Sequence, residues 1–106
     1  MTFHPVASRD DLAEGFPTKV DVDGTPVCLV LAQGEVFAIS DTCSHGQVSL
    51  AEGEVDDCEI ECWLHGSRFD LRTGRPLSLP ATDPVPVHPV KIEDGKVLVD
   101  VQEPHA

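Results

Sequence analysis

Two short segments of the sequence carry residue types that bind transition metals. The first places Cys43 and His45 one residue apart, and the second places Cys62 and His65 two residues apart, with a glycine after each histidine. Sixteen residues separate the two pairs. Thiolate sulfur and imidazole nitrogen are ligands of zinc and of iron–sulfur centres. These four side chains are therefore the candidate metal ligands, and we identify no catalytic residues.

The spacing of the ligands distinguishes between two kinds of metal site. A Cys-x-His pair is tighter than in zinc fingers, where two to four residues separate the first ligands and a helix with two histidines follows. No such helix is predicted after Cys62. Two thiolates and two imidazoles are what a Rieske [2Fe–2S] cluster requires, one pair on each iron. A structural zinc, colourless and redox-silent, is the alternative.

The elements that must position these ligands are short strands. Apolar residues recur with a period of two along most of the chain, and glycine and proline interrupt the pattern at short intervals. Asp23-Gly24 and Asp94-Gly95 lie between extended segments, which is typical of tight hairpins, and Gln33-Gly34 predicts a third turn. The fold class is therefore all-β.

Strands are also predicted next to the ligand segments. Residues Glu54–Glu61 alternate like one strand and Arg68–Leu71 like another, so that each ligand pair would lie on a turn at the tip of a hairpin. Ser8–Glu14 predicts one short helix capped by Ser8. The proline-rich stretch Leu77–Pro89 is expected to be an extended loop that supplies no central strand.

Composition limits the functions of the chain. Its 106 residues suffice for one domain, and the longest apolar run, Val27–Ala32, is too short to cross a membrane. The formal net charge of −12 excludes nucleic acid and anionic lipid as partners and favours a basic protein surface, although solubility alone would also explain it. The N-terminus has no basic leader before an apolar stretch, which predicts a cytoplasmic protein.

The remaining cysteines and histidines receive no functional role. Cys28 lies in an apolar run and Cys58 in an alternating segment, so we expect both to be small buried hydrophobic residues. His4, His88 and His105 have no ligand-type neighbours in the sequence and are interpreted as ordinary surface or loop histidines.

The segment from Cys43 through Pro80 resembles the cluster-binding motif of Rieske proteins. The resemblance implies a Rieske fold, in which a small antiparallel β-sandwich carries an inserted cluster-binding subdomain. Residues 1–106 would form this single domain, with the subdomain at about 42–82. It also implies one [2Fe–2S] cluster, with Cys43 and Cys62 on the buried iron and His45 and His65 on the outer iron. Leu79-Pro80-Ala81 resembles the proline loop that shields the cluster in this family.

The resemblance also bears on the reduction potential. Rieske clusters span roughly −150 to +300 mV, because neutral histidines leave them less negative than all-cysteine clusters at about −400 mV. High-potential members have a disulfide at the positions of Val48 and Leu64, and a tyrosine at that of Phe69. Ser67 does match the family's other hydroxyl donor. Together these positions predict a potential near the low end of the window.

The function implied by the resemblance is electron transfer and not catalysis. The chain is similar to the ferredoxin component of bacterial aromatic ring-hydroxylating dioxygenase systems. Such a monomer would carry one electron at a time from an NAD(P)H-dependent flavoprotein reductase to a terminal oxygenase through transient complexes. The alternative is a small Rieske-like subunit of a nitrite reductase. Trp63 on the second ligand segment would either form part of the docking face or pack beneath the loop.

Overall fold

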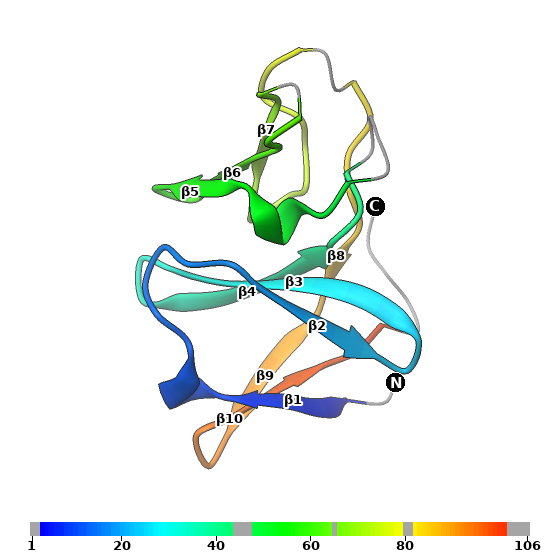
Figure 1. Cartoon of the computed structure of the whole chain (residues 1–106). Coiled ribbons are helices and arrows are strands. Elements are labelled where there is room, and N and C mark those ends of the chain that lie inside the picture. Colours follow the sequence, from blue (N-terminus) through cyan, green and yellow to red (C-terminus); the bar gives the residue numbers. More distant parts are fainter. Residues whose placement is uncertain (1–2, 44–47, 65, 80–81, 102–106) are drawn as a thin grey trace.

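Three antiparallel sheets make up the protein. The computed structural model describes residues 3–43, 48–64, 66–79 and 82–101 (Figure 1). One sheet has the order β1-β10-β9, the second β2-β3-β4-β8 and the third β5-β6-β7. The strands are β1 (His4–Ser8), β2 (Thr18–Val22), β3 (Thr25–Ala32), β4 (Glu35–Ser40), β5 (Glu54–Asp56), β6 (Glu59–Glu61), β7 (Arg68–Asp70), β8 (Val87–His88), β9 (Val90–Glu93) and β10 (Lys96–Val99). The all-β prediction is confirmed.

The three predicted hairpin turns are present. They join β2 to β3, β3 to β4 and β9 to β10. Both residues of each turn have positive φ, which suits the right-handed twist of the paired strands. The angles are 52° and 85° for Asp23-Gly24, 55° and 78° for Gln33-Gly34, and 51° and 75° for Asp94-Gly95.

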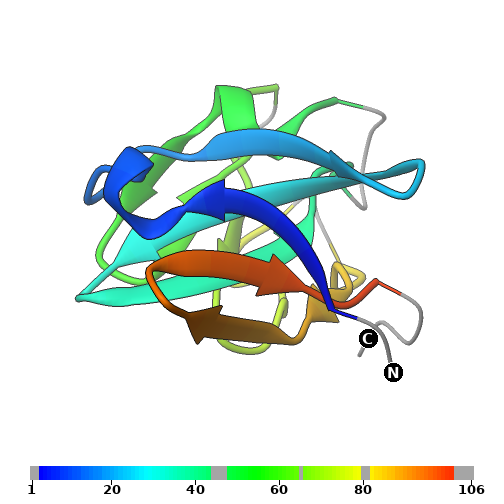
Figure 2. The ribbon, with the colours of Figure 1, turned by 90° about the horizontal axis from the view of Figure 1, so that it is seen from below.

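Strand β3 is the centre of the molecule because both of its faces are buried. Val27, Leu29 and Leu31 pack with Val97 and Val99 of β10 in the core between the first two sheets. Seen from below, β1, β10 and β9 cross this face of the molecule (Figure 2). The alternate residues of β3 face the third sheet, and these are Cys28, Val30 and Ala32. The uninterrupted apolar run is thus explained by a strand between two cores, since successive side chains point to opposite faces.

The third sheet corrects one prediction. Residues Glu54–Glu61 are not one strand but the hairpin of β5 and β6, which turns at Asp57, where φ is 56°. β7 then pairs with β6, so the second ligand segment lies at the tip of the β6–β7 hairpin as predicted. In Figure 1 this sheet lies above the sandwich. It packs on β4 and β3 through Ile60 and Phe69, together with Leu50 from the segment before β5.

Helical structure is shorter than expected. Within the described ranges there are two 3₁₀ turns, η1 (Arg9–Asp11) and η2 (Leu50–Glu52), and none of these elements is long and apolar enough to span a membrane. Ser8 precedes η1 but its side chain forms no cap hydrogen bond. The proline-rich stretch supplies only β8, which pairs with β4 at the sheet edge.

Candidate metal centre

Each of the two ligand segments is a loop that is closed by a backbone hydrogen bond of the same type. The Cys43 N–H donates to the carbonyl oxygen of Val48 (3.0 Å), and the Cys62 N–H donates to that of Ser67 (2.7 Å). In both loops the donor is the candidate cysteine ligand and the acceptor lies five residues later. In the second loop, the Gly66 N–H also donates to the carbonyl oxygen of Cys62 (2.9 Å). Each loop therefore holds its cysteine at a fixed, hydrogen-bonded stem.

The two cysteines are brought together in one buried cluster. Cys43 is 4% exposed and Cys62 is 1% exposed, and both pack with Leu50, Ile60 and Phe69. Both thiols are free of disulfide bonds. His45 and His65 lie outside the described residues, so the structure places two of the four predicted ligands.

The residues that are described fit the cysteine half of a Rieske centre. Two reduced, buried thiols at the stems of two similar loops are suited to bind the inner iron, because thiolate binds iron–sulfur clusters and a dry site excludes competing water. Among the described residues, no group of three or more His, Cys, Asp or Glu side chains is placed to hold a metal. A complete site made from other described side chains therefore finds no support within those ranges.

The structure also describes the positions that are predicted to tune the reduction potential. Ser67 and Phe69 are both completely buried, next to Cys62 and within the same part of the fold. The Phe69 ring belongs to the cluster that contains both cysteines. Val48 is half-buried against this cluster, whereas Leu64 is 43% exposed. Among the described residues, the two cysteines thus pack with apolar side chains, and Ser67 adds a buried residue with a hydroxyl.

The structure places Cys28 and Cys58, the two cysteines outside the motif, in different environments. Cys28 is fully buried on β3, and burial raises the pKa of its thiol, with the negative charge of Asp41 acting in the same direction. Cys58 is only half-buried, and its sulfur accepts a hydrogen bond from the Arg72 guanidinium (3.2 Å). Partial burial raises the pKa of the Cys58 thiol, while Arg72 opposes the shift. The expectation that Cys58 is buried was wrong.

The histidines outside the motif differ from expectation in one case. His4 is half-buried on β1, and His88 is 4% exposed on β8, so His88 is a buried residue and not a surface or loop one. Its strand pairs with β4, which places it in the edge of the sandwich. His105 lies outside the described residues.

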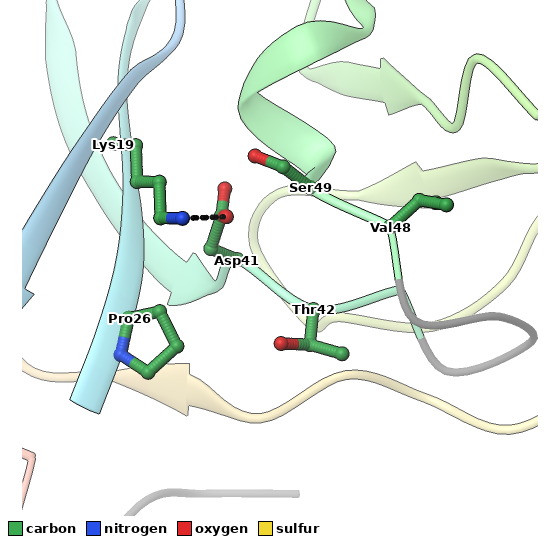
Figure 3. A pocket seen from close by; sticks show the side chains of 6 residues that line it. All are labelled: Lys19, Pro26, Asp41, Thr42, Val48 and Ser49. Carbon is green, nitrogen blue, oxygen red and sulfur yellow. Dashed lines mark ion pairs between the residues drawn. The ribbon is translucent and has the colours of Figure 1, made fainter.

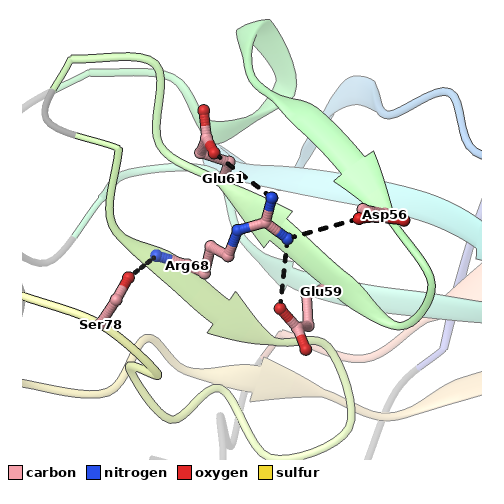
Figure 4. Close-up of polar contacts among 5 residues, drawn as sticks. All are labelled: Asp56, Glu59, Glu61, Arg68 and Ser78. Atoms are coloured by element: carbon pink, nitrogen blue, oxygen red, sulfur yellow. Dashed lines mark hydrogen bonds and ion pairs between the residues drawn. The ribbon is translucent and has the colours of Figure 1, made fainter.

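Two charged groups near the loops were not predicted from the sequence. Arg68, directly after Ser67, has its guanidinium among three carboxylates of the third sheet, those of Asp56 (3.7 Å), Glu59 (3.3 Å) and Glu61 (3.6 Å) (Figure 4). The second is Asp41, which is buried two residues before Cys43. Only its closeness to the motif could have indicated Asp41, and the alternation of residues 59–61 could have indicated the acidic partners of Arg68.

Arg72 connects the third sheet to the sandwich. Besides Cys58, its guanidinium donates to the side-chain oxygen of Gln33 on the β3–β4 turn (3.1 Å). It also lies 5.4 Å from the centre of the Phe37 ring on β4, within cation–π range. These contacts help fix the orientation of the ligand-bearing sheet.

Comparison with known proteins identifies the family. The profile of the Rieske [2Fe–2S] domain matches residues 2–89. The 3-phenylpropionate/cinnamic acid dioxygenase ferredoxin subunit of Escherichia coli K12 is 43% identical over 100 residues, covering 93% of this chain and 91% of that protein. The anthranilate 1,2-dioxygenase ferredoxin subunit of Burkholderia cepacia is 40% identical over 99 residues, covering 93% and 92%.

Solved structures agree with these relatives. The ferredoxin of carbazole 1,9a-dioxygenase from Nocardioides aromaticivorans IC177 superposes with a TM-score of 0.90 at 42% identity, covering 93% of this chain and 97% of that one. A chain from a complex of reduced oxygenase and oxidized ferredoxin in carbazole 1,9a-dioxygenase gives 0.87 at 36% identity, covering 92% and 100%. A putative nitrite reductase small subunit gives a TM-score of 0.82 at 22% identity, covering 95% of this chain and 100% of that one. At this identity the similarity supports the fold alone. The chain belongs to the Rieske [2Fe–2S] domain family.

Proposed function

We propose that this protein is the ferredoxin component of an aromatic ring-hydroxylating dioxygenase system. The observation that carries the proposal is the near-complete mutual coverage, 93% and 91%, with a ferredoxin subunit at 43% identity. In this role the protein is an electron carrier and not an enzyme. It would receive electrons from an NAD(P)H-dependent flavoprotein reductase and deliver them to a terminal oxygenase.

The proposed ligands are Cys43 and Cys62 on the inner iron and His45 and His65 on the outer iron. When bound, a Rieske cluster accepts and releases one electron. The chain's own contribution is to hold the two cysteine stems by their backbone hydrogen bonds and to exclude water from both sulfurs. We assign the ligand loops and the third sheet to a cluster-binding subdomain of about residues 42–82 within a single domain of residues 1–106.

Exposed apolar side chains gather on the segments around the ligand loops. Trp63 is 50% exposed and Leu64 is 43% exposed on the second loop, and Leu77 and Leu79 are 50% and 78% exposed on the stretch that follows β7. That stretch is held to β7, because the Arg68 N–H donates to the Ser78 hydroxyl (3.0 Å) and the Leu77 N–H donates to the Arg68 carbonyl (2.6 Å). We infer that these four apolar residues contact the redox partners, which makes Trp63 part of the docking face.

Charge and size suit short-lived complexes. The net charge of −12 favours partners with basic rims, and electrostatic steering raises association rates without requiring tight binding. A small, partly apolar contact surface allows the rapid dissociation that a carrier needs. The same charge disfavours nucleic acid and anionic membranes, and we place the protein in the cytoplasm as a monomer.

The first experiment is a potentiometric titration of the purified, anaerobic protein monitored by low-temperature electron paramagnetic resonance. We expect a Rieske-type spectrum that appears near the low end of the roughly −150 to +300 mV window. A protein without an iron–sulfur signal that binds zinc would overturn the proposal. A potential near the high end would keep the cluster and overturn the low-potential expectation.

Carrier function is tested by substitution into a related system. The E. coli 3-phenylpropionate/cinnamic acid dioxygenase, assembled without its own ferredoxin subunit, should regain turnover when this protein is added. The Trp63→Ala variant should lower that turnover severalfold at limiting ferredoxin, whereas Phe16→Ala should not, although Phe16 is 69% exposed on the loop between η1 and β2. Turnover should also fall as salt rises through 0.1–0.5 M, because the Debye length shortens below about 10 Å.

A further inference from the structure

Asp41 holds the point at which the first ligand loop leaves the sandwich. Its backbone N–H donates to the carbonyl oxygen of Pro26 on β3 (3.2 Å), and its carbonyl oxygen accepts from the Leu50 N–H (2.6 Å). Its side-chain Oδ1 accepts a hydrogen bond from the Ala51 N–H (3.0 Å). Asp41 therefore ties together the end of β4, strand β3 and turn η2, which lie on the two sides of the Cys43 loop.

The Asp41 carboxylate is buried and has one weak counter-charge among the described residues. Its side chain is 3% exposed, and its Oδ2 lies 3.9 Å from the Lys19 Nζ, whose side chain is 59% exposed (Figure 3). At that separation the pair sits at the outer limit of an ion pair, and a half-exposed ammonium is partly screened by water. The figure shows Lys19 and Ser49 on either side of the carboxylate, at the wall of a pocket that Val48 also lines. The negative charge is thus only partly compensated.

Asp41 lies two residues before Cys43, and its charge acts on Cys28, which shares a buried cluster with Cys43 and Cys62. Cys28 is a member of that cluster, and the Asp41 charge contributes, after burial, to the raised pKa of its thiol. Charges act over longer distances in a poorly solvated interior than in water. A negative charge at this position would oppose the addition of an electron to a centre in this region.

We propose that Asp41 is a positioning residue that fixes the first ligand loop and, by its partly compensated buried charge, keeps the reduction potential of the protein low. The Lys19 ammonium determines how much of the Asp41 charge acts on the reduction potential. The inference rests on the proposed cluster ligands. It assigns the low potential to a specific residue of this chain in addition to the missing tyrosine hydroxyl.

The test measures reduction potentials of the holoprotein in three variants at constant pH and salt. Asp41→Asn keeps the shape of the side chain and one oxygen acceptor for the Ala51 N–H, but removes the charge. Lys19→Met keeps a long apolar stem and removes the counter-charge. Asp57→Asn makes the same charge change on an exposed residue of the β5–β6 turn, where asparagine tolerates the positive φ of 56°.

The variants are expected to move the potential in opposite directions. Asp41→Asn should favour the reduced form by about tenfold, which is about 59 mV upward for one electron. Lys19→Met should move the potential downward, and Asp57→Asn should change it by less than a third of the Asp41→Asn shift. A merely structural role of Asp41 would instead loosen the loop in Asp41→Asn and leave Lys19→Met at the parent potential.

The experiment also distinguishes a failure of the Asp41 inference from a failure of the proposed cluster assignment. A Rieske-type spectrum in the parent protein, followed by equal potentials in Asp41→Asn and Asp57→Asn, would overturn the role of Asp41 while leaving the proposed function intact. Absence of that spectrum in the parent protein would overturn both. If Asp41→Asn assembles poorly, a Lys19→Met potential equal to that of the parent protein would overturn the electrostatic part.

Discussion

Removing Arg68 should weaken the sheet that carries the second ligand loop. The Arg68→Met variant keeps the stem of the side chain on β7 but leaves the carboxylates of Asp56, Glu59 and Glu61 without their shared cation (Figure 4). These carboxylates come from the neighbouring strands β5 and β6, so like charges would face one another across the hairpin. Cross-strand like charges are destabilising.

The size of the effect follows from the exposure of the groups. The Arg68 side chain is 38% exposed and those of Asp56, Glu59 and Glu61 are 76%, 38% and 36% exposed, so each contact is worth only about 0.2–1 kcal/mol after screening. Asp56 contributes least because it is the most exposed. We expect a total of about 1–2 kcal/mol, which changes the population of a locally opened sheet by a factor of about 5–30.

The assay is the rate at which the visible absorbance of the cluster bleaches in a fixed, mildly denaturing concentration of urea. Where opening is rapid and reversible, this rate follows the opened population, so Arg68→Met should bleach about 5- to 30-fold faster than the parent protein. The difference should shrink in 1 M salt, where the Debye length is about 3 Å.

Lys91→Met is the matched control for this prediction. Lys91 and Glu93 pair at 2.6 Å on β9, with both side chains about half exposed, and neither belongs to the ligand-bearing sheet. This variant should bleach within about threefold of the parent protein. Equal bleaching of Arg68→Met and Lys91→Met, or a difference that salt does not reduce, would refute the role given to the Arg68 network.

Three further predictions concern the core around the ligand loops. Phe69→Tyr should raise the potential, by about 59 mV if its hydroxyl donates a bond worth about 1.4 kcal/mol to a reduced-cluster sulfur; an unchanged potential in the redox titration contradicts this. Gly53→Ala should lower the thermal bleaching midpoint by several degrees, because an added Cβ would overlap the carbonyl oxygen of Glu61; an unchanged midpoint would show that the backbone yields. Cys28→Ala should keep the Rieske spectrum, since Cys28 is not among the proposed ligands. Folding raises the pKa of the Cys28 thiol from its ordinary value of 9.0, so the stability that this thiol contributes is complete below pH 9 and is lost as the pH rises above 9. Cys28→Ala should therefore flatten the decline of the free energy of unfolding above pH 9, measured by urea unfolding.

The parts of the fold that depend on local sequence could be predicted. Asp-Gly and Gln-Gly pairs predict hairpin turns because few residues adopt positive φ at two successive positions, and all three turns are present. The β5–β6 turn was missed because only Asp57 has positive φ and no glycine marks it. Alternation continued through that turn in the sequence, so a period-two pattern alone could not distinguish one strand from a short hairpin.

The burial of β3 on both faces is a property of the assembled layers and not of the strand itself. An apolar run of this length is compatible with a buried strand or with part of a buried helix, and only the packing of a third sheet against Cys28, Val30 and Ala32 explains it. The same reasoning applies to His88, whose strand is short and lies after a proline-rich stretch. Its burial follows from pairing with β4, a long-range contact that composition does not indicate.

Charged residues show most clearly the difference between features that local sequence indicates and features that depend on long-range contacts. The sequence could propose Cys43 and Cys62 as ligands because chemistry restricts which residues bind iron, and each lies close to a histidine along the chain. Asp41 and Arg68 contact partners on other elements of the fold. The Asp41 carboxylate, for example, accepts a hydrogen bond from the Ala51 N–H of η2 and lies near the Lys19 ammonium of β2. The sequence has 19 acidic residues, and only the fold shows that Asp41 is buried beside a ligand loop, that Asp100 is buried elsewhere and that most of the other described acidic side chains contact solvent. In a protein of net charge −12, burial decides which of the charges a buried centre experiences, and this is why the proposed effect on the potential is assigned to Asp41 and not to the acidic surface as a whole.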